Sequence, residues 1–168
     1  MTKKIYLIRH AQSEANAALD LDDPTFYYDA RITSLGKEQA LIAHQKLKNI
    51  DFDLMLCSPL TRTLETFSLI FPKPIANTII LPFVREHLDH SCDVGRQPSI
   101  LKKEFPHFSF DEVKEFWWNN NIPIHEKAIN WESLDELDKR IKKFKSWIEK
   151  RSEKKIALVS HGTFISRI

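Results

Sequence analysis

The segment YLIRHAQSEAN, residues 6–16, joins an apolar run to a cationic and a nucleophilic side chain. Arg9 and His10 end this run. Alternation along a strand would place these two side chains on opposite faces, so their joint use requires the chain to turn directly after the strand. Loops beyond the carboxyl ends of strands in open α/β sheets are where ligands bind. We therefore expect Arg9 and His10 to lie in a ligand-binding loop.

Two further apolar runs end on residues of the same kind. Residues 52–57 precede Ser58 and Arg62, and residues 155–159 precede His161. The carboxyl ends of parallel strands meet at one edge of a sheet, so two arginines and two histidines would converge in one cleft. Arginine matches phosphate oxygens with paired hydrogen bonds, and histidine can act as a nucleophile. The spacing predicts a phosphate site for in-line phosphoryl transfer.

Local structure would support both the anion and the nucleophile. A helix that begins near Thr61 could offer its N-terminal amides to phosphate. Neighbouring arginines would lower the pKa of His10 and keep its imidazole neutral and nucleophilic. Ser13 and Asn16 suit either contacts to the substrate or the turn and cap of a helix.

Periodicity predicts the elements that must position these side chains. Short apolar runs predict strands at 5–8, 52–57 and 78–81, and a fourth from 155 that ends near Ser160. Apolar spacing and caps predict helices at 33–49, 61–71 and 133–151, and residues 17–31 read as a loop. Strands that alternate with helices imply a largely parallel sheet. The expected fold is α/β, a three-layer sandwich with a mostly parallel sheet flanked by helices.

Composition narrows the class of protein. The chain has 168 residues, 42% hydrophobic and 29% charged, which suits one globular domain at 1–168 with an inserted loop and helix region at about 87–131. Its formal net charge of +2 argues against nucleic acid as a partner. Its apolar runs are too short to span a membrane. Its two cysteines are too few for a disulfide framework, so we expect a cytoplasmic location.

Two features of the inserted region have competing interpretations. His87, His90 and Cys92 lie close enough in sequence to suggest a metal site, but no fourth ligand stands at a recognisable spacing. We therefore expect no metal, and the chemistry above requires no organic cofactor. The FWW run at 116–118 suits packing of the insertion better than a platform for the substrate.

Four short segments together resemble the signature blocks of the histidine phosphatase superfamily, also called the phosphoglycerate mutase-like family. They are RHAQSEAN, SPLTRTLETF, REH at 85–87 and VSHGTF, in the family's order. The stretch DARITSLGKEQA, residues 29–40, is similar to the one that this family places before its first helix. The segments RHAQ and HSCDVG resemble most closely a plant and fungal phosphoglycerate mutase-like subgroup.

The resemblance implies roles for individual residues. It implies that His10 is phosphorylated during turnover and that Arg9, Arg62 and His161 bind the transferring phosphoryl group. Asn16 aligns with a further polar contact, and Glu86 falls where one branch of the family places its proton donor. The remaining candidates for contact with the substrate are Ser13 and Gly162.

The sequence departs from the family pattern at two places. Ala11 stands where the first block usually has glycine, and its methyl group narrows the allowed backbone angles. The sequence ends at Ile168, whereas family members usually continue with another helix after the block that contains Gly162. Either a segment is missing from this sequence, or the core closes differently.

The favoured activity is hydrolysis of a phosphate monoester, a small phosphorylated metabolite, through a phosphohistidine. Glu86 would protonate the departing oxygen and then activate water. The family's other branch uses an acid directly after its second histidine, where this chain has Gly162. A phosphoglycerate-type mutase is an alternative, although such enzymes are usually longer. A non-catalytic phosphate-binding module is a second alternative. The sequence leaves the oligomeric state open.

Overall fold

Four parallel strands form the sheet, and the expected α/β class is confirmed. The computed structural model describes residues 2–20, 27–73, 77–120 and 129–168. The strands run in the order β1-β4-β2-β3, each parallel to its neighbours. Their bounds are β1 Lys4–Arg9, β2 Leu54–Cys57, β3 Thr78–Ile80 and β4 Lys155–Ser160. All four carboxyl ends therefore lie at one edge of the sheet.

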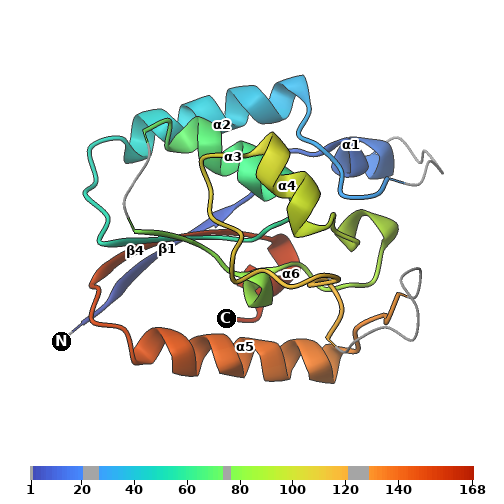
Figure 1. The fold of residues 1–168 in the computed structure, drawn as a ribbon. Coiled ribbons are helices and arrows are strands. Elements are labelled where there is room, and N and C mark those ends of the chain that lie inside the picture. The colour runs from blue at the N-terminus through green and yellow to red at the C-terminus, as the bar shows by residue number, and fades with distance from the viewer. Residues whose placement is uncertain (1, 21–26, 74–76, 121–128) are drawn as a thin grey trace.

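Helices cover both faces of this sheet, which gives the three layers (Figure 1). One face carries α2, α3 and α4, and the other carries α5 and α6. The bounds are α2 Ser34–Leu47, α3 Thr61–Ile70, α4 Pro98–Glu104, α5 Leu134–Glu149 and α6 Gly162–Ser166. None of the helices in the described part of the chain is long and apolar enough to cross a membrane.

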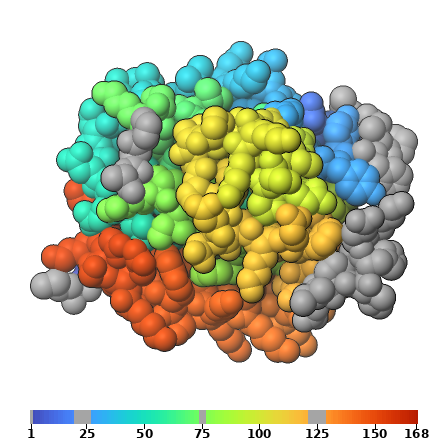
Figure 2. All heavy atoms as spheres, viewed as in Figure 1, coloured from blue at the N-terminus to red at the C-terminus, as the bar shows by residue number. Residues whose placement is uncertain are grey.

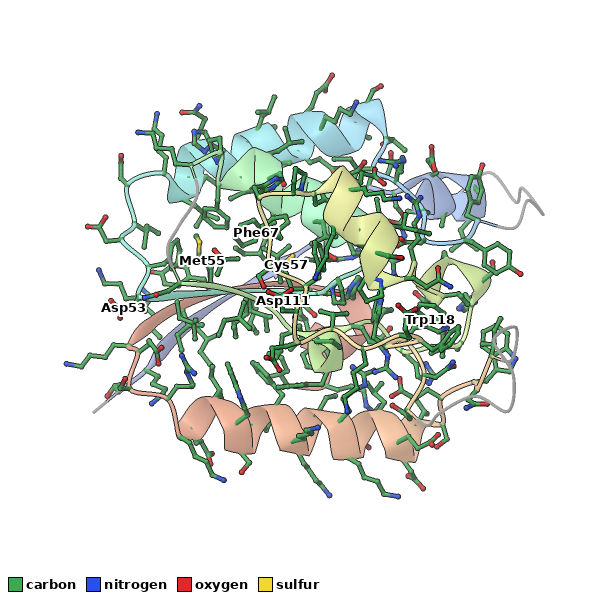
Figure 3. The ribbon with its side chains drawn as sticks, viewed as in Figure 1. Asp53, Met55, Cys57, Phe67, Asp111 and Trp118 are labelled. Atoms are coloured by element: carbon green, nitrogen blue, oxygen red, sulfur yellow. The ribbon has the colours of Figure 1, made fainter. Side chains whose placement is uncertain are left out.

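Alternation along the two central strands builds one core on each face of the sheet. In β2, Met55 and Cys57 pack against the α3 side, where they meet Phe67 (Figure 3). Leu54 and Leu56 point the other way and join the cluster that includes the apolar side of α5. Because successive side chains of a strand face opposite layers, an apolar run buried on both faces identifies a central strand.

The first strand, β1, is only partly buried. β1 pairs with β4 alone, so it lies at an edge of the sheet, and the side chain of Leu7 is 42% exposed. A four-residue apolar run carries no signal that separates an edge strand from a central one, because only its neighbours decide how much of it is covered.

The expected loop at 17–31 begins as a helix, α1, which spans Glu14–Asp20. Ser13 caps it, because the backbone N–H of Asn16 donates to the Ser13 hydroxyl at 3.2 Å. Ala15 and Ala18 are buried on its inner side. Alanine is the strongest helix former, so cap and composition outweigh the turn residues that follow. Residues 21–26 of the expected loop lie outside the described part of the chain.

The inserted region packs onto the sheet as an aromatic layer. It contains α4 and the short 3₁₀ helix η2, Ser91–Asp93, and a second 3₁₀ helix, η1 Pro82–Val84, comes before it. Trp117 and Trp118 are buried in the same cluster as Met55, so the packing interpretation of these two tryptophans is confirmed. Figure 2 shows the yellow to gold residues of the insertion covering one face, above the orange α5. Residues 121–128 lie outside the description.

Candidate active site

Three predicted side chains meet at the carboxyl edge of the sheet. His10 follows β1, Arg62 lies in the first turn of α3 directly after β2, and His161 follows β4. The Nε–H of Arg62 donates to Nε2 of His10 at 3.2 Å. The ring centroids of the two histidines are 5.1 Å apart. All three side chains are buried, so the structure places an imidazole pair beside a guanidinium with little water around them.

Hydrogen bonds define the tautomer of His10. Nδ1 lies 2.7 Å from the carbonyl oxygen of Ala11, which can only accept, so Nδ1 carries the proton. Nε2 faces the N–H of Arg62, which can only donate, so Nε2 presents its lone pair. Burial, and then the positive charge of Arg62, lower the pKa of His10 from 6.5 to about 3. His10 is therefore a neutral imidazole with its nucleophilic nitrogen turned toward the cation.

The guanidinium of Arg62 is held from its far side. Its Nη2 donates to the carboxylate of Asp93 at 2.8 Å, and its Nη1 donates to the carbonyl of Cys92 at 2.6 Å. Asp93 is itself buried. Paired contacts of this kind fix the plane of a guanidinium as well as its position. The sequence did not predict this contact, because nothing in its spacing links residue 93 to residue 62.

The first amide of α3 is engaged within the fold and is not available to phosphate. The N–H and the hydroxyl of Thr61 both donate to the carboxylate of Asp29, at 2.7 and 2.6 Å. Asp29 adopts a left-handed backbone with φ of 43°, which aspartate tolerates better than most residues. Arg96 pairs with the same carboxylate at 3.3 Å. Asp29 thus acts as a distant N-cap that sets the start of the helix carrying Arg62.

His161 keeps one ring nitrogen for a ligand. Its Nε2 lies 2.8 Å from the hydroxyl oxygen of Ser58. Its Nδ1 is buried without a hydrogen-bond partner among the described residues. Burial, and then the charge of Arg62, hold the pKa of His161 well below its ordinary value. A neutral, fully buried imidazole with an unsatisfied nitrogen is what a site presents when a polar ligand completes it.

Glu86 lies at the start of α6, next to His161 in space. Its carboxylate accepts the backbone N–H groups of Thr163 at 3.1 Å and Phe164 at 3.2 Å, and that of His87 at 2.9 Å. The first two amides belong to the opening turn of α6. The structure therefore fixes Glu86 to the element that follows His161.

The loop that carries Glu86 is anchored from below by Arg140 of α5. Arg140 donates to the carbonyl oxygens of Phe83, Arg85 and Glu86, at 3.1, 2.8 and 3.1 Å. It also donates to Glu132 at 2.6 Å. Burial acts against ionisation of Glu132, but the hydrogen bond from Arg140 and the charge of Arg85 lower its pKa to about 2. Arg85 joins this buried pair from a separate segment, 47 positions away from Glu132, so sequence spacing alone gave no sign of its place there.

Arg9 and Asn16 share a hollow with the nucleophile. Its volume is about 310 Å³, and its lining residues are Arg9, His10, Gln12, Asn16, Leu19 and Gln39. Arg9 is exposed, and Gly162 stands beside it, since a Cβ on Gly162 would lie 3.5 Å from the Arg9 Nε. The predicted contact residues Arg9, Asn16 and Gly162 thus lie at one mouth of the site.

Ser13 has its hydroxyl engaged inside the fold. The hydroxyl and the backbone N–H of Ser13 both donate to Oδ1 of Asn16, at 3.0 and 3.1 Å. The side chain of Ser13 is buried, whereas that of Asn16 reaches the hollow. The structure therefore gives Ser13 the capping role and leaves the amide nitrogen of Asn16 for a ligand.

A small group of candidate metal ligands lies near the site, but not the group that the sequence considered. Within the described residues, ligand atoms of Asp89, His90 and Asp93 lie within 4.8 Å of one another. Nδ1 of His87 lies 3.0 Å from Oδ2 of Asp89, so His87 contacts one member of this group. The backbone carbonyl of Cys92 accepts a hydrogen bond from Arg62. The carboxylate of Asp93 already pairs with Arg62.

The buried histidines predict acid-sensitive folding. The pKa of His10 is about 3 in the folded chain and near 6.5 in the unfolded one, so the unfolded chain binds more protons between these values. The stability that His10 contributes is complete above about pH 6.5 and is lost as the pH falls toward 3. We expect the free energy of urea unfolding to fall between pH 6.5 and 5, and to fall less in His10→Asn. A His107→Asn variant, changed at an exposed position, should keep the wild-type slope; equal slopes in all three proteins would contradict the burial effect.

Comparison with known proteins places the chain among phosphate-transferring enzymes. The sequence model of the histidine phosphatase superfamily, branch 1, matches residues 5–168. The chain is 31% identical to phosphoglycerate mutase-like protein 1 of Arabidopsis thaliana, over 97% of this chain and 69% of that protein. It is 25% identical to the adenosylcobalamin/alpha-ribazole phosphatase of Escherichia coli, over 97% of this chain and 75% of that one.

The fold has counterparts among solved structures. The alpha-ribazole phosphatase from Shigella flexneri superimposes with a TM-score of 0.64 at 24% identity, over 96% of this chain and 75% of that chain. At this sequence identity, the structural similarity supports the arrangement of sheet and helices and nothing more. It agrees with the family match.

Proposed function

Because this chain belongs to the histidine phosphatase superfamily and is a phosphatase, we propose that it hydrolyses a small phosphate monoester through a phosphohistidine on His10. The observation that carries the proposal is the imidazole of His10, which burial keeps neutral. Its Nε2 presents a lone pair and lies 3.2 Å from Nε of Arg62. A buried imidazole in this state can attack phosphorus without first losing a proton. The unsatisfied Nδ1 of His161 marks the side on which a phosphoryl oxygen would bind.

In the first step, Nε2 of His10 releases the hydrogen bond from the Nε–H of Arg62 and attacks phosphorus in line with the ester oxygen. The bond between phosphorus and Nε2 forms as the ester bond breaks, and the departing alcohol oxygen takes a proton from the carboxyl group of Glu86. In the second step, water attacks phosphorus, gives its proton to the Glu86 carboxylate, and breaks the bond to Nε2. Phosphate and free His10 are the products.

Three side chains would stabilise the charge on the phosphoryl oxygens. A guanidinium has five N–H donors, and the contacts of Arg62 with His10, Asp93 and Cys92 use one each, which leaves two for the substrate. Arg9 adds a second cation at the mouth. His161 can donate from Nδ1 if Ser58 donates its hydroxyl proton to Nε2. Such prearranged donors are the main source of catalysis in phosphoryl transfer.

The proposal is tested by following phosphate release from a panel of alkyl, aryl and sugar phosphates. We expect release of inorganic phosphate from at least one alkyl ester, with the alcohol as the only other product. A rearranged ester that retains its phosphoryl group would identify a mutase instead. Binding of phosphate without turnover of any ester would identify a phosphate-binding module.

Chelation of divalent ions should leave this activity in place. The positive charge for the phosphoryl oxygens comes from Arg9 and Arg62, so no step above needs a metal ion. Phosphate release measured before and after treatment with EDTA should agree within error. Loss of activity that a divalent ion restores would contradict this expectation and would direct attention to Asp89, His90 and Asp93.

A further inference from the structure

A groove outside the candidate active site lies between the inserted region and α5. The gold residues of the insertion and the orange residues of α5 stand on either side of it in Figure 2, and residues 79–83 complete its described lining. Its volume is about 1120 Å³, enough for a small organic molecule, since such pockets span about 300–1,000 Å³. None of its described lining residues also lines the hollow beside His10.

The lining of this groove is rich in aromatic rings. Phe83, Phe116 and Trp147 line it, and each is partly exposed. The ring centroids of Phe83 and Trp147 are 5.8 Å apart, with an angle of 75° between the ring planes. Ile79 and Leu81 add aliphatic surface to the same lining. Partly exposed rings in a concave surface favour a flat apolar ligand, which buries them and can stack on them.

Two buried arginines also line the groove, and they share one carboxylate. Arg85 and Arg140 both donate to Glu132, and all three side chains are buried. Two cations and one anion leave one positive charge without a partner inside this group. Burial, and then the charge of Arg140, lower the pKa of Arg85 to about 9, so its guanidinium stays protonated at neutral pH. A buried cation in excess of its partners is stabilised by a further anion.

The donors of the two guanidinium groups show where such an anion would bind. All five N–H groups of Arg140 donate to protein acceptors, at 2.6 to 3.1 Å. Nε of Arg85 donates to the carbonyl of Trp118 at 2.8 Å. Nη2 of Arg85 donates to Asn120 at 2.8 Å and to Glu132 at 3.4 Å. Nη1 of Arg85 has no acceptor among the described residues, so its two N–H groups are left for a ligand.

The α5 side of the groove adds more positive charge. Lys139 and Lys143 are exposed there, and the ammonium of Lys143 lies 5.3 Å from the ring centroid of Phe83. The described lining has five basic and three acidic side chains. One of these acids, Glu136, already accepts the N–H and the hydroxyl of Ser133, at 2.8 and 2.9 Å. The cations of α5 therefore stand next to the aromatic part of the groove.

We propose that this groove binds a flat aromatic acid, with its carboxylate on Nη1 of Arg85 and its ring against Phe83 and Trp147. A carboxylate supplies the acceptor oxygens and the negative charge that the arginine group lacks. The groove is then a second ligand site, apart from the candidate active site. Arg85 directly precedes Glu86, so the ligand contacts the segment that carries the proposed proton donor.

Calorimetric titration with 2-naphthoate and with 2-naphthylmethanol tests the proposal, because both probes carry the same ring system and only the first is an acid. In wild type, Kd should be at least about 10-fold lower for 2-naphthoate, as expected for hydrogen bonds to a charged group. Arg85→Gln removes the excess charge and leaves Glu132 paired with Arg140, so it should abolish this difference. Lys143→Glu reverses a charge on an exposed position and should weaken binding of 2-naphthoate alone.

A matched control separates the groove from the general charge of α5. Lys142→Glu makes the same change at the neighbouring exposed position, outside the described lining, and should keep both wild-type Kd values. Equal Kd values for the two probes in wild type would overturn the proposal. So would an unchanged Kd for 2-naphthoate in Arg85→Gln and Lys143→Glu. If Arg85→Gln fails to unfold cooperatively in urea, the comparison of Lys143→Glu with Lys142→Glu decides alone.

Competition with inorganic phosphate tests whether the groove is separate from the candidate active site. Saturating phosphate should leave the Kd of 2-naphthoate unchanged. Displacement of 2-naphthoate by phosphate would place this acid beside His10 and would overturn the proposal. None of these titrations needs turnover, so the aromatic acid site stands or falls independently of the proposed hydrolysis.

Discussion

Replacing His10 with alanine is expected to lower kcat/KM for every phosphate monoester by at least about 10⁴-fold. The change removes Nε2, the atom that forms the bond to phosphorus, and loss of a nucleophile has effects of this size in other enzymes that work through covalent intermediates. Arg62 keeps its partners Asp93 and Cys92 in the variant, so phosphate should still bind. Steady-state phosphate release together with competition by inorganic phosphate would measure both quantities.

A control variant shows whether the loss is specific to this histidine. His107→Ala makes the same chemical change at an exposed position in the inserted region and should retain wild-type kcat/KM. Both variants should unfold cooperatively at neutral pH. Turnover by His10→Ala within about 10-fold of wild type would reject a covalent role for His10, because alanine has no nitrogen that could form the bond to phosphorus.

Replacing Glu86 with glutamine is expected to produce a defect that depends on the leaving group. An alkyl phosphate departs as a basic alkoxide, and proton donation by a positioned acid is worth about 100- to 10,000-fold. An activated aryl phosphate departs as a weak base and gains little from a proton. Formation of the phosphoenzyme should therefore slow steeply for the alkyl ester and slightly for the aryl ester. Burst kinetics separate this step from the later attack by water.

The same variant also alters a structural contact, and the choice of ester separates the two effects. The amide nitrogen of glutamine cannot accept the N–H of Thr163 or Phe164, so one of these bonds to α6 is lost. A loosened α6 would slow both esters alike, because it would displace His161 for either substrate. Equal slowing of the two bursts would thus assign Glu86 to positioning. No change in either burst would move the search for the donor to Asp89, Asp93 or Glu14.

The sequence predicted the parts of the site that depend on strand ends. The apolar run of β4 is buried on both faces of the sheet, and its end delivers His161 to the edge where β2 delivers Ser58 and Arg62. These positions follow from parallel pairing alone, because every carboxyl end then lies at the same edge. The register of β1 with β4 places His10 beside them, and the N–H of His10 bonds the carbonyl of Ser160.

The parts that the sequence missed are contacts between distant segments. Asp29 caps α3 across 32 positions of sequence, and Asp93 holds Arg62 across 31. Glu132 meets Arg85 across 47 positions, so the two residues stand on either side of the inserted region. Such carboxylates resemble loop acids in the sequence, since burial and the position of the partner exist only after folding.

The stereochemical course at phosphorus tests the central claim most directly. Each in-line displacement inverts phosphorus, so attack by His10 followed by attack by water gives net retention. The substrate is a phosphorothioate monoester made chiral with oxygen isotopes and hydrolysed in water that carries a third isotope. Net retention is the result predicted for a phosphohistidine intermediate, whether or not that intermediate accumulates. Net inversion would mean that water attacks the substrate directly, and it would contradict the role assigned to His10.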